Sequence, residues 1–294
     1  MSRVSHMSAA AGGGRAARGA RGTLGSAGLY AALLVATVLF LVPFYLIARN
    51  ALSTDADITG ETWTFFPTDL QWGNVRELFA DPAVPFARAL WNSLVVGVLH
   101  TAGTLLLCST AGYGLARIPY RHAQKVFYLV LGTLMVPAAV TFVPTFVLVS
   151  SLGWVSSLRG LVIPGLFSGF TAFLFRQYFL GFPRELEEAA RVDGLNHWGA
   201  YWRVVVPNSL NFFAAIAVIT FIGGWNAFLW PLVIGQDQES WTVQVALSSY
   251  LTAQTVNLHL IFMAAAISIL PLILVFLVLQ RWLVQGVAQT GIKG

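Results

Sequence analysis

Charged side chains are scarce in this chain. They make up 10% of its 294 residues, whereas hydrophobic side chains make up 57%. A soluble globular domain carries about 25% charged residues. The composition therefore excludes an ordinary soluble protein and indicates a protein embedded in a lipid bilayer.

Cysteine and the motifs of common catalytic sites are also scarce. The single cysteine, Cys108, lies in an apolar run, which excludes a disulfide bond within the chain. The sequence has no G-x-x-x-x-G-K-[ST] loop for nucleotide phosphates and no H-E-x-x-H or G-x-S-x-G motif, and its five histidines are dispersed. We therefore expect no catalytic residue, no metal site and no cofactor in this chain.

Long uncharged runs are present instead, and they predict an all-α membrane protein with six transmembrane helices. Residues 28–48 carry no charge over 21 positions, which is about the length that crosses the hydrocarbon core. The further predicted spans are residues 89–116, 126–150, 160–175 with their flanks, 208–234 and 260–280. Prolines and glycines in the third to fifth spans predict broken or kinked helices there.

These spans divide the chain into a transmembrane domain and two tails. The domain covers residues 28–281 and includes an acidic, ordered outer loop at 49–88 and a second outer loop at 236–257. The tail at 1–27 is rich in Gly, Ala and Arg, and we predict that it is disordered because it has no large apolar cluster to bury. Residues 282–294 are predicted to form a short cytoplasmic tail.

Basic residues indicate how the spans are oriented. The formal net charge is +5, yet no basic segment is interleaved with aromatic residues as in a nucleic-acid-binding module. Of the 17 Lys and Arg residues, 13 fall in segments that are cytoplasmic if the N-terminus is cytoplasmic. Because cytoplasmic loops carry an excess of Lys and Arg, we predict a multi-pass protein of the cell membrane with both termini in the cytoplasm and no nucleic-acid partner.

A charged segment at residues 183–207 interrupts the apolar spans. Seven of its side chains are charged, and each costs roughly 2.5 to 3.5 kcal/mol at the centre of a bilayer, so the segment must lie in water. Its sequence predicts two short helices around one turn, with Gly194 in a left-handed conformation and Asn196 capping the second helix. Glu187 and Arg191 are spaced for an i,i+4 ion pair.

The same segment resembles a known loop. Glu188-Ala189-Ala190 is followed after three residues by Gly194 and after nine more by Val204-Val205-Val206-Pro207. This spacing is similar to the EAA loop of inner-membrane permease subunits of binding-protein-dependent ABC importers, which docks into an ATPase subunit. The resemblance implies that the ATPase-coupling residues are Glu188, Ala189, Ala190, Asp193, Gly194 and Pro207. An amphipathic helix pair that packs on its own bundle is the alternative interpretation.

Further segments resemble the carbohydrate-uptake branch of these permeases, of the maltose-permease type. They include Asn92-Ser93-Leu94, Gly224-Trp225-Asn226 and the C-terminal residues 284–294. Two departures from the family pattern are Ala227, where an acid is common, and the lack of a proline at 208–211. The resemblance implies a second permease subunit in a heterodimer, two ATPase subunits that bind ATP and Mg²⁺, and an extracytoplasmic solute-binding protein.

Polar residues within the spans are candidates for a substrate path. His100 lies well inside an apolar run, and such residues usually face a bundle interior or a water-filled path. Trp225 and Asn226 offer the aromatic face and the amide that bind sugars, and Asn92 is a further polar candidate. The alternatives are a hydrogen-bonded packing role for His100 and anchoring of Trp225 and Asn226 at the membrane interface.

The second outer loop is a candidate contact with the binding protein. The resemblance places the family's corresponding loop against that protein, and Asp237, Glu239 and Trp241 offer polar and aromatic contacts there. A solvated turn is the alternative.

The sequence therefore predicts a permease subunit of an ATP-driven carbohydrate importer, whose ATPase is a separate chain. An autonomous secondary carrier or channel for a small solute, the alternative function, should show intramembrane acids or an inverted repeat. All twelve acidic residues map to loops. A membrane-embedded enzyme would need a clustered nucleophile or metal set, which the sequence lacks.

Overall fold

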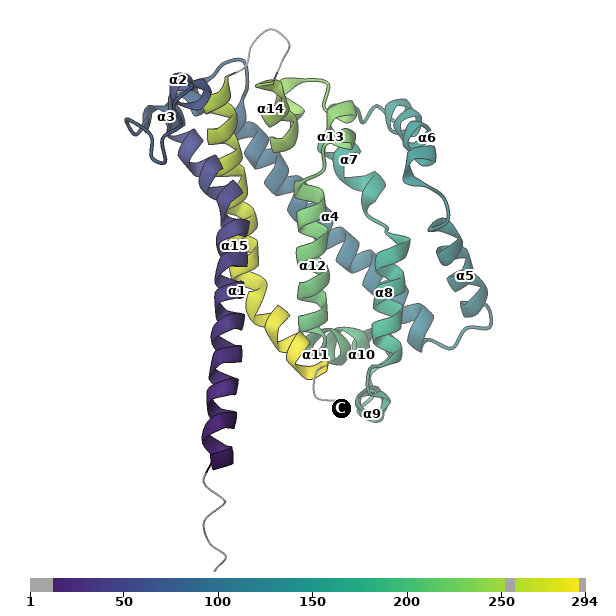
Figure 1. The fold of residues 1–294 in the computed structure, drawn as a ribbon. Coiled ribbons are helices and arrows are strands. Elements are labelled where there is room, and N and C mark those ends of the chain that lie inside the picture. Colours follow the sequence, from purple (N-terminus) through teal and green to yellow (C-terminus); the bar gives the residue numbers. More distant parts are fainter. Residues whose placement is uncertain (1–12, 252–256, 291–294) are drawn as a thin grey trace, which may run out of the picture.

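The computed structural model describes residues 13–251 and 257–290, with side chains described over 28–251 and 257–282. Every regular element assigned within these residues is a helix (Figure 1). The predicted all-α fold class is therefore confirmed.

Three helices are long and apolar enough to cross a membrane without a break. They are α1 (Gly13–Ala51), α4 (Phe86–Arg117) and α15 (Leu258–Thr290). These helices contain the first, second and sixth predicted spans. An uninterrupted hydrophobic run of this length forms a helix in a bilayer, because a helix satisfies the backbone hydrogen bonds of the segment internally.

The two predicted tails differ from the structure. α1 begins at Gly13 and so extends into the segment 1–27 for which the sequence predicted disorder. Ala and Arg in this stretch are strong helix formers that prolong the membrane helix. Likewise, α15 continues to Thr290, beyond the boundary predicted at residue 281. Residues 1–12 and 291–294 of the tails lie outside the described residues.

The third and fourth spans each consist of helices that bend at a short break. α5 (Ala123–Thr133) and α6 (Ala138–Ser151) meet at 95°. The short helices α7 and η1 (Leu158–Val162 and Ile163–Gly165) meet α8 (Gly169–Leu180) at 47°. Pro137, before α6, has no backbone N–H with which to continue α5. The predicted breaks in this region are confirmed.

The fifth predicted span is also interrupted. α12 (Leu210–Trp225) ends at Asn226, and the shorter α13 (Leu229–Ile234) follows it. α12 bends by 79° from the helical segment His197–Asn208 before it. If each bent pair counts as one span, the described residues hold up to six spans, in agreement with the prediction.

The elements outside the spans gather at two opposite ends of the molecule (Figure 1). The first end, named here the loop end, contains α2 (Asp55–Thr59), α3 (Gly73–Ala80) and α14 (Val243–Ser249). The second end, named the α9 end, contains α9 (Arg184–Val192), α10 (His197–Ala200), the π-helical η2 (Tyr201–Val205) and α11 (Val206–Asn208). Segments that the sequence assigned to opposite sides of the membrane thus lie at opposite ends of the fold.

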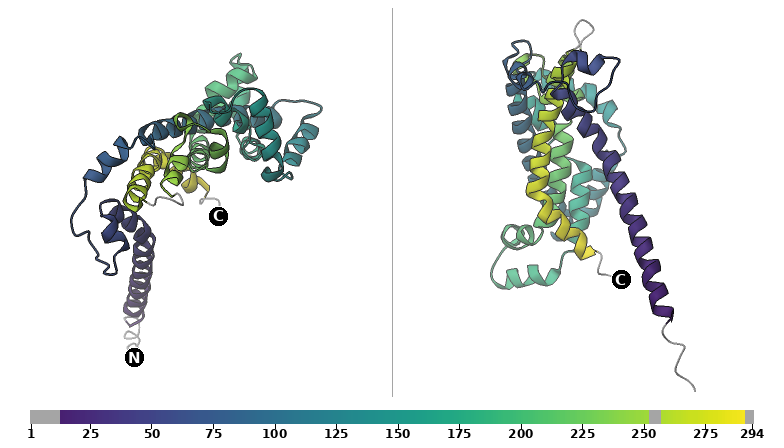
Figure 2. Two further views of the ribbon diagram at one scale, coloured as in Figure 1. Left: turned by 90° about the horizontal axis from the view of Figure 1, so that it is seen from above. Right: turned by 60° about the vertical axis from the view of Figure 1, so that its left-hand side comes forward.

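α4 is central to the packing. It packs along α8 and α12, while α15 packs against both α12 and α1. Seen from above, the spans form a curved wall with α1 at one edge and α5 at the other (Figure 2). Buried side chains gather around Trp225 in one cluster and around Phe175 in another.

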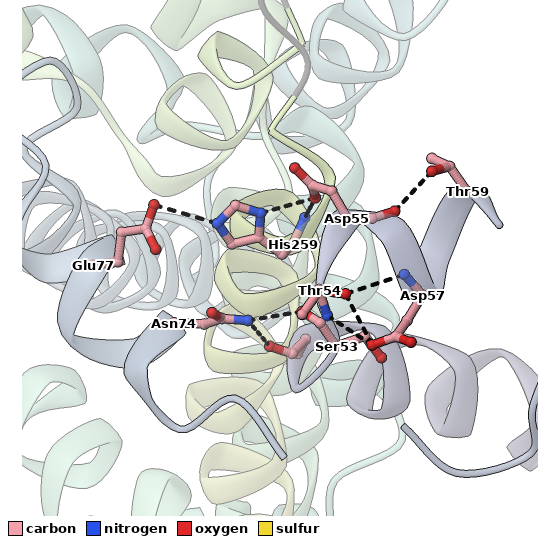
Figure 3. Close-up of polar contacts among 9 residues, drawn as sticks. Ser53, Thr54, Asp55, Asp57, Thr59, Asn74, Glu77 and His259 are labelled. Carbon is pink, nitrogen blue, oxygen red and sulfur yellow. Dashed lines mark hydrogen bonds and ion pairs between the residues drawn. The ribbon is translucent and has the colours of Figure 1, made fainter. Parts of the chain in front are cut away.

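A group of polar contacts joins the first outer loop to the first turn of α15 (Figure 3). His259 Nδ1 lies 2.8 Å from Asp55 Oδ1, and His259 Nε2 lies 3.3 Å from Glu77 Oε1. The buried Asn74 donates its side-chain N–H groups to two backbone carbonyls at the end of α1. These contacts confirm that the loop at 49–88 is ordered, and they fix it to the end of α1 and to the start of α15.

Candidate functional site

A cavity of about 370 Å³ lies among the spans, where α4, α6, η1, α12 and α13 meet. His100, Thr141 and Thr145 supply polar groups to its wall, and Phe142 and Trp230 supply aromatic rings. Among the described residues, no Asp, Glu, Lys or Arg side chain lines it. The cavity therefore offers hydrogen bonds and aromatic faces without formal carboxylate, ammonium or guanidinium charge.

His100 is held in this wall by the close approach of two backbone segments. Its Nε2 lies 3.0 Å from the carbonyl oxygen of Gly165. A Cβ atom at Gly165 would lie only 2.8 Å from that nitrogen, and one at Gly224 would lie 3.9 Å from Nδ1. Only a residue without a side chain fits at position 165 while the imidazole keeps its place.

The other polar and aromatic groups of the cavity wall were not predicted from the sequence. The Thr145 hydroxyl donates to the backbone carbonyl of Thr141, and the Thr141 hydroxyl donates to the backbone carbonyl of Ala138. Both hydroxyl oxygens therefore keep lone pairs that can accept a hydrogen bond. Trp230 Nε1 donates to a backbone carbonyl, and its ring stands at 88° to that of Phe142. The available signal was the i,i+4 spacing of two threonines on an otherwise apolar helix.

The structure does not bring the four predicted path residues together. Only His100 lines the cavity. Asn92 is buried and donates its side-chain N–H groups to the carbonyl oxygens of Glu239 and Trp241, at 2.7 and 2.9 Å. Trp225 is buried and donates to the carbonyl of Ser268. Asn226 is exposed, and its side-chain oxygen accepts a hydrogen bond from Gln244.

The predicted binding-protein contacts lie in the connection between α13 and α14, at the loop end. Asp237 caps the short helix η3 (Gln238–Ser240), accepting the backbone N–H of Ser240 at 2.8 Å. The hydrogen bonds from Ser240 hold the pKa of Asp237 below its usual value, so this exposed side chain is a carboxylate at neutral pH. Glu239 is exposed as well, whereas Trp241 is half-buried against the cluster around Trp225.

At the α9 end, the predicted turn is confirmed in detail. Gly194 has φ +84°, and the backbone N–H groups of Gly194 and Leu195 donate to the carbonyls of Arg191 and Ala190. This pair of bonds is the Schellman ending of a helix, which requires a left-handed residue. Asn196 then caps α10 by accepting the N–H of Gly199 at 2.7 Å.

The predicted coupling residues share this solvent-facing element. Glu188, Ala189, Asp193, Gly194 and Pro207 are exposed, and Ala190 is buried beneath them. Large apolar side chains are exposed beside them, including Val192 at 88% and Trp198 at 59%. Exposed apolar groups in a charged, water-facing segment indicate a surface that another protein covers.

The ion pair predicted for Glu187 is wrong. Its Oε1 lies 3.2 Å from Arg117 Nε at the end of α4, and both side chains are 5% exposed. Arg191 instead faces His197, with 3.3 Å between Nη2 and Nδ1. Spacing within one helix favoured Arg191, but the tertiary fold brings a buried partner closer, and this pairing is not visible in the local sequence.

Broken membrane helices around a polar cavity without formal charge, with a solvent-facing helix pair at one end, are features of membrane transport proteins. Residues 108–289 match the family described as "Binding-protein-dependent transport system inner membrane component". The chain belongs to this family, as its resemblance predicted. It is therefore an inner-membrane component of a transport system that works with a solute-binding protein.

Relatives with assigned transport functions cover most of the chain. The chain is 32% identical to the arabinooligosaccharides transport system permease protein AraQ of Bacillus subtilis (strain 168), over 88% of this chain and 92% of that protein. It is 34% identical to the lactose transport system permease protein LacG of Rhizobium radiobacter, over 87% and 93%. It is 30% identical to the sn-glycerol-3-phosphate transport system permease protein UgpE of Yersinia enterocolitica, over 88% and 94%.

A solved structure has the same fold. A chain of a bacterial ABC transporter involved in the import of the acidic polysaccharide alginate superposes with a TM-score of 0.77 at 23% identity. The match covers 87% of this chain and 96% of that chain. At this identity the likeness supports the arrangement of helices and leaves the solute to be argued from the cavity.

Proposed function

We propose that this chain forms half of the translocation path for a neutral carbohydrate in an ATP-driven importer. The cavity beside His100 is the observation that carries the proposal. Threonine hydroxyls and an imidazole can exchange hydrogen bonds with sugar hydroxyls, while Phe142 and Trp230 offer apolar faces for the C–H groups of a sugar ring. The names of two relatives, which transport arabinooligosaccharides and lactose, support this solute class.

The charge of the cavity favours a neutral sugar over an anionic solute. A phosphate or carboxylate that leaves water is stabilised mainly by Arg, Lys or backbone N–H groups. None of the Arg or Lys side chains in the described residues lines this cavity. The system is thus closer in its expected solute to the lactose relative than to the glycerol-3-phosphate relative.

Among the predicted path residues, His100 keeps its proposed contact with the solute. Asn92 and Trp225 do not line the cavity. We assign them a positioning role instead, because the hydrogen bonds of Asn92 hold the segment after α13 in place and that of Trp225 holds the end of α12. Asn226, exposed near the cavity residue Ala227, remains a proposed contact along the path.

Coupling to ATP hydrolysis is assigned to the α9 end. Glu188, Ala189, Ala190, Asp193, Gly194 and Pro207 form the element that we propose docks into the ATPase. Exposed Val192 and Trp198 give that contact an apolar centre. ATP and Mg²⁺ are bound by two partner ATPase subunits, since the sequence contains no phosphate-binding loop of its own. A second permease subunit supplies the other half of the path.

The loop end is assigned to the binding protein. Asp237, Glu239 and Trp241 present two acids and an aromatic side chain there. This assignment sets the orientation: the loop end faces outward, and the start of α1 and the end of α15, which lie toward the α9 end, are on the cytoplasmic side with the two termini (Figure 1). The distribution of Lys and Arg supports the same orientation.

Uptake by the complete complex in lipid vesicles tests the proposal. We expect uptake of a neutral oligosaccharide that requires ATP and the binding protein and that sn-glycerol 3-phosphate does not inhibit. Combined Thr141→Val and Thr145→Val should lower uptake about tenfold, because each lost hydrogen bond contributes about 0.5 to 1.5 kcal/mol.

Thr110→Val is the matched control, since its hydroxyl also bonds to a backbone carbonyl but lies outside the cavity. Uptake by this chain without its partners would support an autonomous carrier instead. Uptake unaffected by the double threonine substitution would reject the cavity as the path.

A further inference from the structure

A buried group of three side chains connects α9 to the end of α4. Arg117 is the last residue of α4, and Tyr113 lies one helical turn before it, so both face the same side. Arg117 Nε lies 3.2 Å from Glu187 Oε1, and the Tyr113 hydroxyl donates to Glu187 Oε2 at 3.1 Å. Glu187 thus accepts a hydrogen bond from Tyr113 through Oε2 and lies within ion-pair distance of Arg117 through Oε1, without a hydrogen bond between Oε1 and Nε.

The same guanidinium also holds the chain where it enters α9. Arg117 Nη2 donates to the carbonyl oxygen of Phe182, two residues before α9 begins. The guanidinium thus makes an ion pair with Glu187 in α9 and a hydrogen bond to the chain just before α9, and these two contacts limit the position of α9. α9 is therefore fixed to α4 at two points by one side chain.

Within the described residues, the ion pair and the hydrogen bond of Glu187 connect α9 to α4 through side chains. The backbone of α9 packs mainly against α10 and η2, whereas α4 packs against α8 and α12. A pocket of about 330 Å³ is lined by Arg117 and Glu187 themselves together with Arg184, Glu188 and Arg191, so solvent or a partner approaches the ion pair from this side. If α9 moves, either these buried contacts break or α4 moves together with α9.

α4 extends from this connection to the cavity. His100 and Arg117 lie on one unbroken helix, 17 residues apart, which corresponds to about 25 Å along the axis. A continuous helix transmits a shift at one end to the other end more directly than the bent spans do. α4 is thus a direct mechanical connection between the α9 end and the cavity wall.

We propose that Arg117, Glu187 and Tyr113 form a buried latch that transmits movement of the coupling element to α4 and so to the His100 wall of the cavity. A buried ion pair is weak support for stability by itself, because removing two charges from water offsets much of their attraction. Its benefit here is geometric, since it limits the position of α9 on α4. The latch rests on the proposed coupling function and names its positioning residues.

The ratio of solute transported to ATP hydrolysed is the appropriate measurement. It is made on the complete complex in vesicles containing Arg117→Gln, Glu187→Gln or both substitutions. Loss of the latch should lower this ratio about tenfold in each single variant, within the range typical of coupling between sites. The double variant should be no worse than either single variant, because both remove the same contact.

Glu185→Gln is the matched control, since it removes an exposed carboxylate from the same helix. A merely structural role would lower transport and ATP hydrolysis together and leave their ratio unchanged, which would overturn the latch. A ratio equal to that of the control in both single variants would overturn it as well.

Tyr113→Phe provides a milder test if the charge variants are not recovered as complexes. It removes one hydroxyl and keeps the ion pair, and we expect a fall in the ratio of about two- to fivefold, the lower part of the range for the loss of one hydrogen bond. An unchanged ratio in this variant would overturn the latch. Absence of ATP-dependent uptake in the unsubstituted complex would reject the proposed function itself, and the latch with it.

Discussion

Single glycines decide how closely the helices of this protein approach its functional side chains. Gly165 leaves room for the imidazole of His100, and Gly112 lets α4 approach α8, where an added Cβ would lie 2.6 Å from the Cβ of Phe175. Small residues at helix contacts are common in membrane proteins, because van der Waals packing rather than hydrophobic burial drives helix association there. At position 165, the absence of a side chain leaves room for the imidazole of His100 in the cavity wall.

Gly165→Ala should reduce uptake about tenfold, because the new methyl group displaces the His100 ring and overpacking of this kind costs about 1 to 3 kcal/mol. Gly132→Ala is the control, since a Cβ at that position meets no atom within 4 Å. Uptake and recovery of the complex are compared in the two variants. Equal uptake in both would show that the placement of His100 is unimportant for transport.

At the scale of the element, the turn between α9 and α10 sets the shape of the coupling surface. Its left-handed glycine and its asparagine cap place Ala189 and Trp198 on the same solvent-facing element. Both signals are local in sequence, which is why this turn could be predicted. The π-helical η2 that follows has no comparable local signal and was not predicted.

Gly194→Val should leave membrane insertion normal but cause loss of uptake and of the co-purifying ATPase. A left-handed conformation costs about 1 to 2 kcal/mol for a residue with a Cβ, and more for a β-branched one, so the turn must strain or redirect α10. Gly194→Asn is the matched variant, because asparagine tolerates this conformation and should retain both activities. Near-normal uptake and ATPase recovery in Gly194→Val would contradict a coupling role for this element.

At the scale of the whole molecule, the spans were predictable and their contacts were not. Apolar length and proline positions are properties of short segments, so six spans and their breaks followed from the sequence. The contacts of Glu187 with Arg117 and of Asn92 with the segment after α13 join residues far apart in the chain. Their partners are selected by tertiary packing, and this is why the predicted substrate path retained only His100 in the cavity.

The two ends of the molecule should respond differently to substitution. Asp237→Asn with Glu239→Gln removes two charges from the loop end and keeps an oxygen at position 237 to cap η3. We expect the stimulation of ATPase activity by the binding protein to fall about fivefold, because charges at an interface rim mainly affect association. The ATPase should still co-purify, in contrast with Gly194→Val.

Glu61→Gln is the control for this experiment, since Glu61 is an exposed acid of the other outer loop. Stimulation that is equal in the control and the double variant would show that the loop between α13 and α14 does not contact the binding protein.

The contact between α1 and α15 has a consequence for biosynthesis. These helices are the first and the last of the described chain, they pack side by side, and His259 at the start of α15 joins the loop that follows α1. During synthesis, α1 enters the bilayer long before its partner exists, and its broadly exposed apolar surface is compatible with a period surrounded by lipid alone. α15, which emerges from the ribosome long after α1, therefore completes the packing of α1, and a chain truncated before α15 leaves the outer loop without its attachment to His259.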